Sequence, residues 1–372
     1  MKYYLIAGEA SGDLHGGNLI TAIRQMDPDA VLQAWGGDFM ESAGARLVKH
    51  FKDLAFMGFA EVVKHLPTIL GNLKFCKKDI LAFAPDVLIL IDYPGFNLRI
   101  AKWAKQHHIK VAYYISPQVW AWKESRVPSM KKNIDEMMVI LPFEKEYFLQ
   151  KWNWNVTYVG HPLVEVVDAF YATEQFEKMN EGFSKPVISL LPGSRKQEIL
   201  KKLPLMLEAS KAFPDFHFMI AKAPGMEDTF YESLTTDYPH VTFLKNKTYA
   251  LLSIASASLT TSGTATLETA LFGVPEVVCY KGNPISYRIA RKLIKIKYIS
   301  LVNLIMDKEV VKELIQDELT VDNLIAELKK ILEDQKVRLQ MKQDFVTLKN
   351  ILSAGGHASS NAAKIIYGLA KR

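Results

Sequence analysis

The sequence predicts an α/β protein made of two doubly wound parallel sheets. Three observations support this fold class. Short apolar runs alternate with amphipathic segments along the chain, which is the pattern of successive βαβ units. The alternation starts again after residue 185, and each half carries a glycine-marked turn, GEASGD at 8–13 and SGTATLE at 262–268. Such turns join a buried strand to a helix whose unpaired N–H groups and dipole attract anions.

Length and composition favour two domains in a reducing compartment. At 372 residues the chain exceeds what one hydrophobic core usually serves, and its 49% hydrophobic content can fill two cores. The two cysteines, Cys76 and Cys279, are too few for a disulfide framework or a zinc site, which favours the cytoplasm. No apolar run approaches the ~20 residues that span a bilayer, so we expect any membrane contact to be peripheral. A net charge of +6 weakly favours anionic partners.

In the first half, apolar runs predict the strands. YYLIA at 3–7 is shorter than the hydrophobic region of a signal peptide and is therefore the first strand. The elements predicted after it are a helix over 16–25, a strand near 31–37, a strand over 87–92 and a helix over 97–106.

The second half repeats this rhythm from PVISLLPGSR at 186–195. A hinge is expected at about 160–186, where a Gly-His-Pro turn breaks the pattern. We therefore expect one domain over 1–165, a second over 166–340, and helices over 341–372 that pack back onto the first. The other elements predicted in the second half are a helix near 200–213 and strands over 216–221, 241–244, 256–263 and 275–281.

LLPGSR at 190–195 is a candidate phosphate site. It leads from a buried run to a helix start, with Arg195 at its mouth. An arginine fork there can clamp a diphosphate at two points, and Ser194 can cap the helix while it contacts the same oxygens. The alternative is that Ser194 is only a cap and Arg195 a solvated side chain.

SGTATLE at 262–268 is the second part of that site. Ser262, Gly263 and Thr264 open a helix whose free N–H groups should face Arg195 across the carboxyl edge of one sheet. Glu268 follows one helical turn later and can accept hydrogen bonds from both hydroxyls of a ribose. The alternative for Glu268 is a capping residue favoured by the helix dipole.

GEASGD at 8–13 lacks the GxGxxG spacing of a dinucleotide fold, which disfavours a nicotinamide enzyme. Ser11, Gly12 and Asp13 instead either line the other side of the cleft between the domains or form a tight turn in which Asp13 caps a helix.

IDYPGFN at 91–97 places Asp92 at the carboxyl end of a strongly apolar strand. An acid there can act as a general base, an effect worth roughly 10²- to 10⁴-fold in rate. The alternative is an Asx-type turn that local N–H groups satisfy. Glu9 and His15 are rival bases, although a histidine beside a pair of glycines is more often structural.

We expect no metal and no cofactor. Asp27, Pro28 and Asp29 imitate a DxD metal motif, but they follow a helix and lie away from any strand end, so we interpret them as a turn. HExxH, CxxC and Walker sequences do not occur.

Two stretches indicate a substrate or surface that is both lipid-like and anionic. Residues 54–78 are apolar on more than one helical face and end in basic residues; the alternative is a helix pair in the core. Residues 281–297 carry Lys and Arg with no acid, which suits an anionic leaflet; the alternative is a solvated helix face. No RNA-binding module accompanies them, so nucleic acid is not an expected partner. Trp120 and Trp122 either extend this surface or belong to the core.

Together these residues resemble the lipid-A-disaccharide synthase family of GT-B glycosyltransferases. The resemblance runs nearly from one end of the chain to the other. The segments that carry it are GEASGD at 8–13, GGDFM at 36–40, MGFAEV at 57–62, YYISPQVWAWKESRV at 113–127, GHPL at 160–163, LLPGSR at 190–195, SGTATLE at 262–268 and SLVNLIMDKEVVKELIQ at 300–316.

The resemblance implies a GT-B architecture, in which two Rossmann-like domains face each other across a cleft. It implies an inverting transfer of 2,3-diacylglucosamine from UDP-2,3-diacylglucosamine to 2,3-diacylglucosamine 1-phosphate, giving the β(1→6) disaccharide and UDP. The first domain would bind the acceptor lipid and the second the UDP-sugar. The residues implied to hold the donor are Arg195, Ser262, Gly263, Thr264 and Glu268, completed by Asn303, Glu313 and Gln316.

Asp92 is the best match for the acid that the family needs on the acceptor side. One departure bears on it, because the family's usual form of IDYPGFN has a second acid where this chain has Gly95. If that second acid is the family's base, Asp92 or another group must replace it here.

The resemblance also implies a homodimer and a peripheral position on the cytoplasmic face of the inner membrane. Two kinds of rival function stay open. One is another UDP-sugar enzyme of the same architecture, such as a 2-epimerase or the muramyl-lipid glucosaminyltransferase. The other is a non-catalytic UDP-sugar sensor at the membrane.

Overall fold

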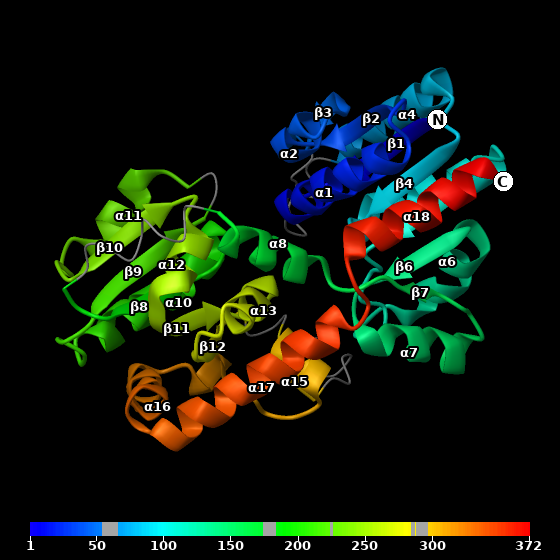
Figure 1. The fold of residues 1–372 in the computed structure, drawn as a ribbon. Coiled ribbons are helices and arrows are strands. Elements are labelled where there is room, and N and C mark those ends of the chain that lie inside the picture. The colour runs from blue at the N-terminus through cyan, green and yellow to red at the C-terminus, as the bar shows by residue number, and fades with distance from the viewer. Residues whose placement is uncertain (54–65, 174–183, 224–225, 284–286, 288–296) are drawn as a thin grey trace. The chain divides into compact units, whose positions relative to one another are not determined.

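The computed structural model describes residues 1–53, 66–173, 184–223, 226–283, 287 and 297–372. It consists of two compact units (Figure 1). Unit 1 contains Met1–Pro162 and Leu352–Arg372, and unit 2 contains Leu163–Ile351. Parts of the predicted hinge and of the two stretches expected at a membrane, residues 174–183, 54–65, 284–286 and 288–296, lie outside the described residues.

Unit 1 is built on a parallel sheet with the strand order β3-β2-β1-β4-β5-β6-β7 in the part that the structure describes. The chain moves outward from β1 to β3, then returns to β4 on the other side of β1. The order therefore reverses between β1 and β4, and the two predicted strands at this point are confirmed. The strands are β1 (Lys2–Ala7), β2 (Val31–Gly36), β3 (Arg46–His50), β4 (Val87–Ile91), β5 (Val111–Tyr114), β6 (Glu136–Val139) and β7 (Thr157–Tyr158).

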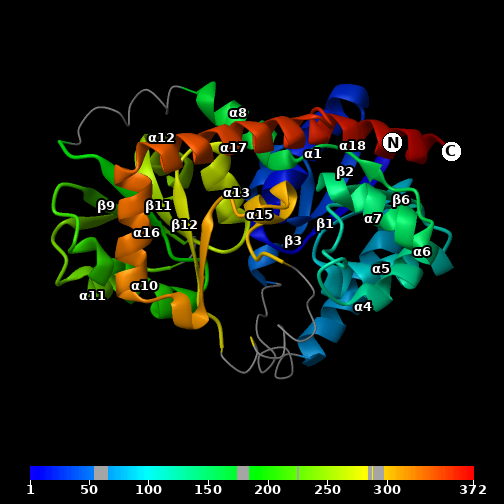
Figure 2. The same ribbon diagram turned by 90° about the horizontal axis from the view of Figure 1, so that it is seen from below.

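Helices cover both faces of this sheet (Figure 2). Successive residues of a strand point to opposite faces, so Leu5 packs with α1 and α18 whereas Tyr4 and Ile6 pack with α4, α5 and α6. The helices of unit 1 are α1 (Ala10–Met26), α2 (Asp38–Ser42), α4 (Leu66–Phe83), α5 (Pro94–Gln106), α6 (Val127–Asn133), α7 (Pro142–Trp152) and α18 (Ala358–Lys371), with 3₁₀ turns η1 (Phe51–Asp53) and η2 (Glu124–Arg126).

The first helix begins at Ala10, so the prediction of a start at Gly16 is wrong. Gly16 and Gly17 lie inside α1, where glycine costs up to about 1 kcal/mol relative to alanine. Their place is explained by close packing, because a Cβ on Gly17 would lie 3.0 Å from the backbone oxygen of Phe39 in α2. The two glycines therefore allow α2 to approach α1 and do not mark a helix boundary.

The last helix, α18, packs against α1 in unit 1 (Figure 1). Its buried face is lined with small and aliphatic side chains, among them Ala358, Ala362 and Ile366. The segment before it is fixed by a hydrogen bond from the Tyr158 hydroxyl to the backbone oxygen of Leu352 at 3.0 Å.

Unit 2 contains a second parallel sheet, with the order β10-β9-β8-β11-β12-β13 in its described part. The order reverses between β8 and β11. The predicted class of two doubly wound parallel sheets is thus confirmed. The strands are β8 (Val187–Leu191), β9 (His217–Lys222), β10 (Val241–Lys245), β11 (Ala255–Thr261), β12 (Glu276–Tyr280) and β13 (Lys312–Ile315).

The helices of unit 2 alternate with these strands. The helix predicted near 200–213 starts earlier, at Lys196, directly after the turn that carries Arg195. No helix in the described parts of either unit is both long and apolar enough to cross a membrane. The helices are α8 (Pro162–Tyr171), α10 (Lys196–Ser210), α11 (Asp228–Thr235), α12 (Thr248–Ile254), α13 (Thr264–Leu271), α15 (Leu301–Met306), α16 (Val321–Glu333) and α17 (Gln335–Ser353), with the 3₁₀ turn η3 (Gln316–Glu318).

Candidate functional site

In unit 2, two turns leave the carboxyl edge of the sheet side by side. Strands β8 and β11 are parallel neighbours, with Thr260 opposite Leu191. The turns that follow them, 192–195 and 262–264, therefore emerge next to each other, as the sequence predicts. We call them the phosphate turns. They lie where the strand order reverses, which is the position at which doubly wound sheets bind ligands.

The second phosphate turn presents the start of α13. Gly263 is the N-cap, with φ of 144°, and offers no side-chain cap. A Cβ there would meet no described atom within 4 Å, so the approach to the first N–H groups of α13 is open on this side. The Ser262 hydroxyl donates to the backbone oxygen of Ile299 at 3.2 Å. Ser262 thus anchors the turn, while the backbone at Gly263 and Thr264 is the part suited to an anion.

The first phosphate turn presents Arg195. Its Nη1 atom lies 3.2 Å from Glu198 Oε1, and the Arg195 side chain is 55% exposed. An ion pair this exposed contributes at most about 1 kcal/mol, so a diphosphate can compete for the guanidinium. Arg195 itself is the N-cap of α10, with no side-chain cap. The expectation that Ser194 caps this helix is therefore wrong, because Arg195 occupies the N-cap position. Contact of Ser194 with phosphate stays a prediction.

The buried Lys202 side chain lies next to both phosphate turns. It is 3% exposed, and its Nζ donates to Thr261 Oγ1, on the last residue of β11. The same Nζ lies 3.4 Å from where a Cβ on Gly193 would be. Burial lowers the pKa of Lys202, and the nearby Glu198 carboxylate raises it again. The structure thus holds a cation against both turns.

The sequence carries a signal for Lys202, although Lys202 belongs to no motif. Along α10, Ile199, Leu203 and Met206 form the buried face. A helical position three residues after Ile199 lies on that same face. A lysine at a core-facing position needs a specific partner, and here the partner is the end of β11.

Replacing Lys202 with methionine is expected to raise the Kd for UDP about tenfold, which corresponds to about 1.4 kcal/mol. The variant keeps the approximate length of the side chain but removes the charge behind the position expected for the diphosphate. Calorimetric titrations with UDP and with uridine measure the effect, and uridine binding should be unchanged. The matched control is Lys201→Met, which removes an exposed lysine from the same helix. An equal loss of UDP and uridine binding would indicate a structural role alone.

Glu268 lies on α13 and is held by Tyr249. The Tyr249 hydroxyl donates to Glu268 Oε1 at 3.0 Å. Burial raises the pKa of the Glu268 carboxyl, and this hydrogen bond lowers it. Tyr249 thus orients this carboxylate, and contact of Glu268 with a ribose stays a prediction.

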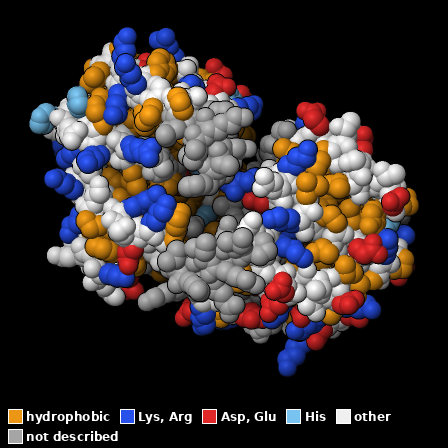
Figure 3. Space-filling model, turned by 180° about the vertical axis from the view of Figure 1, so that it is seen from behind, with side chains coloured by type: hydrophobic (Ala, Val, Ile, Leu, Met, Phe, Trp, Pro, Cys, Tyr) orange, Lys and Arg blue, Asp and Glu red, His pale blue; other side chains and the backbone are white. Residues whose placement is uncertain are grey.

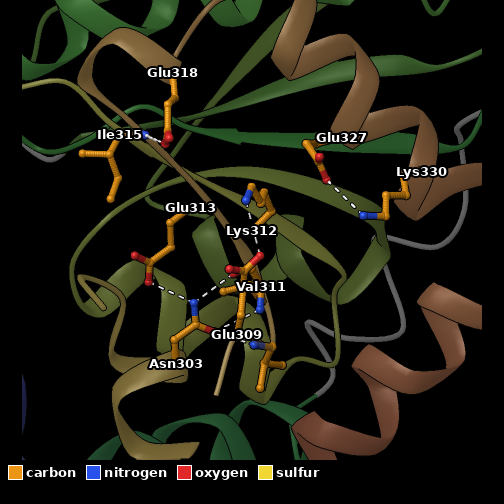
Figure 4. Close-up of polar contacts among 10 residues, drawn as sticks. Asn303, Glu309, Val311, Lys312, Glu313, Ile315, Glu318, Glu327 and Lys330 are labelled. Carbon is orange, nitrogen blue, oxygen red and sulfur yellow. Dashed lines mark hydrogen bonds and ion pairs between the residues drawn. The ribbon is translucent and has the colours of Figure 1, made fainter. Parts of the chain in front are cut away.

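Asn303 and Glu313 are joined by a hydrogen bond in unit 2 (Figure 4). Asn303 is fully buried, its Oδ1 accepts from the N–H groups of Val310 and Val311, and its Nδ2 donates to Glu313 Oε1 at 2.9 Å. Glu313 also accepts from the N–H groups of Ile299 and Ser300. Because these polar atoms are hydrogen-bonded within the protein, Asn303 and Glu313 stabilise the loop at Ile299, to which Ser262 is hydrogen-bonded. Donor contact by Asn303 or Glu313 stays a prediction.

Gln316 follows β13 with φ of 53°. Its Oε1 accepts from the N–H of Gly282 at 3.2 Å, whereas its buried Nε2 has no partner among the described residues. This amide is a donor that a ligand could satisfy, and its role at the donor side stays a prediction.

Unit 1 has an equivalent position between β1 and β4. Ala7 is opposite Ile91 in the parallel ladder, so GEASGD and Asp92 leave the same edge. The two turns touch, since a Cβ on Gly8 would lie 2.3 Å from the Tyr93 ring. Asp92 and Tyr93 have φ of 44° and 47°, and left-handed conformations at non-glycine residues are a strain typical of functional sites.

Local hydrogen bonds hold the backbone of Asp92. Its carbonyl oxygen accepts from Asn97 Nδ2 at 2.8 Å and from the Tyr113 hydroxyl. Burial, and then the nearby Glu9 carboxylate, raise the pKa of the Asp92 carboxyl to about 6. Such a carboxylate is ionised at neutral pH yet more basic than an ordinary one, which suits a general base.

His15 is a weaker candidate base. It is buried in α1, and burial lowers its pKa to about 4. A base whose protonated form is this unfavourable accepts a proton poorly at neutral pH. Asp92 is therefore favoured over its histidine rival.

Asp13 connects two helices. It is 2% exposed, and its carboxylate accepts hydrogen bonds from the N–H groups of Gly37, Phe39 and Met40 at 2.7, 3.1 and 3.1 Å. It therefore caps α2 from within α1, which differs from the predicted cap of its own helix. Ser11 is exposed and Gly12 is buried, and contact of these three residues with substrate stays a prediction.

Replacing Asp13 with alanine is expected to lower the free energy of unfolding of unit 1 by about 3 kcal/mol, because buried N–H groups lose a charged acceptor. Urea denaturation followed by tryptophan fluorescence measures this, since all 6 tryptophans lie in unit 1. Ser11→Ala, an exposed change in the same turn, should be nearly neutral. Equal midpoints for the two variants would refute the capping role.

Comparison with known proteins identifies the family. The profile of the lipid-A-disaccharide synthetase family matches residues 3–366. The chain belongs to this family. It is 38% identical to the lipid-A-disaccharide synthase of Syntrophus aciditrophicus (strain SB) over 376 residues, covering 99% of this chain and 97% of that protein. It is 36% identical to that of Trichlorobacter lovleyi over 361 residues, covering 95% and 94%.

Solved structures show the same fold as this member of the lipid-A-disaccharide synthetase family. The UDP-GlcNAc 2-epimerase of Neisseria meningitidis, bound to UDP-GlcNAc, has a TM-score of 0.69 at 13% identity, covering 99% of each chain. The glycotransferase of kitacinnamycin has a TM-score of 0.65 at 16% identity, covering 99% of this chain and 98% of that one. The chain thus has the GT-B fold, as the sequence resemblance implies, and its membership of the family makes it a glycosyltransferase.

Proposed function

We propose that this chain transfers 2,3-diacylglucosamine from UDP-2,3-diacylglucosamine to 2,3-diacylglucosamine 1-phosphate, forming the β(1→6) lipid A disaccharide and UDP. Membership of the family supports the reaction. One observation supports the assignment of one substrate to each unit: each unit places its candidate residues where its own strand order reverses. Unit 2 then serves the anionic donor and unit 1 the hydroxyl of the acceptor.

On the donor side, the diphosphate binds the phosphate turns. The first N–H groups of α13 and the Arg195 guanidinium bind its oxygens, and Lys202 adds positive charge from beneath. As the bond between the anomeric carbon and the diphosphate breaks, negative charge grows on the leaving group. Preorganised donors stabilise that charge in the transition state.

On the acceptor side, the 6-hydroxyl loses its proton to the Asp92 carboxylate while its oxygen attacks the anomeric carbon. Attack from the face opposite UDP inverts the configuration at that carbon. The proton ends on Asp92, and the electron pair of the broken bond leaves with UDP. Glu9 supports this role because its charge makes Asp92 more basic.

One assay tests the function. The purified chain is incubated with both lipid substrates, with and without EDTA, and the products are separated by mass. We expect the disaccharide and an equal amount of UDP, formed only when both substrates are present. Epimerised UDP-sugar without disaccharide would support the 2-epimerase alternative, and bound but unconsumed donor would support a sensor.

We also propose a peripheral position on the cytoplasmic face of the inner membrane and a homodimeric state. Two acylated substrates and a net charge of +6 support the first, and the family resemblance supports the second. Co-sedimentation with anionic vesicles at rising salt tests the membrane contact, and light scattering tests the mass. Binding that ignores both salt and lipid charge would count against the first proposal.

A further inference from the structure

A groove runs between α5 and α6 in unit 1. Its first part is a cavity of about 300 Å³, and a second cavity adjoins it, because Lys102, Ser129 and Asn133 line both. Apolar side chains, among them Leu98 and Met130, form part of the wall. No residue of the donor side lines it.

The groove is strongly basic. Arg99, Lys102 and Arg126 line the first cavity, Lys105 and Lys132 line the second, and no acidic residue lines either. Lys105 is paired with Asp135, whereas Arg99 and Lys102 make no ion pair with any residue that the structure describes. Figure 3 shows this face of unit 1, where Lys and Arg side chains gather among hydrophobic ones. The groove therefore has unneutralised positive charge.

The groove begins beside the candidate base. Pro94 and Gly95, which directly follow the Asp92–Tyr93 turn, line its mouth. The Tyr113 hydroxyl donates to the Asp92 carbonyl. Arg126 lines the first cavity together with Pro94 and Gly95. Arg126 therefore lies near the Asp92–Tyr93 turn.

Gly95 keeps this mouth open. A Cβ there would meet no described atom within 4 Å. Gly95 places no charge at the entrance of this basic groove, which favours an anionic ligand.

We propose that the groove between α5 and α6 binds the phosphate of the acceptor, with Arg99, Lys102 and Arg126 as its ligands. The assignment deepens the proposed function and depends on it. A phosphomonoester carries a charge of about −1.5 to −2 and three acceptor oxygens, and arginine forks bind such groups at two points. With its 1-phosphate in the groove, the acceptor extends its sugar ring toward Asp92, and the apolar wall contacts the sugar face and the start of the acyl chains.

The test compares acceptors with and without the phosphate. The variant Arg99→Gln/Lys102→Gln changes two exposed side chains, so folding should be preserved. In neutral detergent micelles, we expect its KM for the phosphorylated acceptor to rise about tenfold or more, while kcat at saturation and the KM for the donor stay unchanged. Its KM for the dephosphorylated acceptor should equal that of the unmodified chain. The matched control is Lys145→Gln, an exposed lysine on α7.

Three results would overturn the proposal. They are an unchanged KM for the phosphorylated acceptor, an equal loss for both acceptors, and a loss seen only on anionic vesicles, which would assign the charge to lipid headgroups. Equilibrium binding of the two acceptors gives the same comparison without turnover. Phosphate-dependent binding in a chain that forms no disaccharide would therefore refute the proposed function while it preserves the subsite.

Discussion

Replacing Arg195 with alanine is expected to lower kcat by about 10²- to 10³-fold, the usual loss when one donor to a developing anion is removed. The guanidinium is exposed at the first phosphate turn and is paired only with Glu198 among the described residues, so its removal should not disturb the fold. The departing diphosphate gains charge in the transition state, and the lost interaction is strongest there. Steady-state kinetics with saturating donor and acceptor measure the effect.

Two comparisons distinguish this role from a general loss of charge. Lys201→Ala removes a cation from the same helix and should leave kcat nearly unchanged. The KM for the acceptor should change little in Arg195→Ala, because the arginine is assigned to the donor. A near-normal kcat in Arg195→Ala would contradict the assignment.

Replacing Asp92 with asparagine is expected to lower kcat by about 10²- to 10⁴-fold, the range for loss of a general base. Asparagine preserves the size of the side chain, and the strained backbone is held by Asn97 and Tyr113 through the carbonyl. The loss should therefore report proton transfer and not unfolding.

The pH profile of kcat/KM provides a second readout for Asp92. Because its carboxyl has a pKa of about 6 and the base must be deprotonated to act, kcat/KM should be constant well above pH 6 and fall tenfold per unit well below it. Glu9→Gln removes a neighbouring negative charge, so it should move this limb to lower pH.

Two outcomes would transfer the role to another group. One is an Asp92→Asn variant with near-normal kcat. The other is an unchanged acid limb in that variant. Gly95→Asp then becomes informative, because the open space at this position accommodates the side chain. Rescue of Asp92→Asn by Gly95→Asp would show that a carboxylate at position 95 can replace Asp92 as the base.

Several features of the fold follow directly from sequence pattern. Five-residue apolar runs such as 87–91 are buried on both faces of a parallel sheet, and this burial makes them recognisable as strands. The position of the phosphate turns on neighbouring strands also follows from the βαβ rule. The start of α1 does not follow from sequence pattern. Gly16 and Gly17 allow the close approach of α2, and local helix propensity gives no information about this contact between helices.

The sequence predicts the positions of candidate site residues where local backbone geometry decides them. It does not predict contacts with residues distant in the sequence. The positions of Gly263 and Arg195 follow from the strand-turn-helix pattern of the sequence. Asp13 caps a helix 24 to 27 residues away, and Asn303 is satisfied by loop N–H groups, so neither role is visible in a short motif. Lys202 was overlooked because it belongs to no motif, although its place on a buried helix face marked it as unusual.

A crystal structure of the chain with UDP, grown in the presence of EDTA, tests the central claim most directly. We predict that the diphosphate lies within hydrogen-bond distance of the backbone N–H groups at 263–265 and of the Arg195 guanidinium. Density for UDP away from the 192–195 and 262–264 turns, or binding that appears only when a divalent cation is restored, would contradict the account.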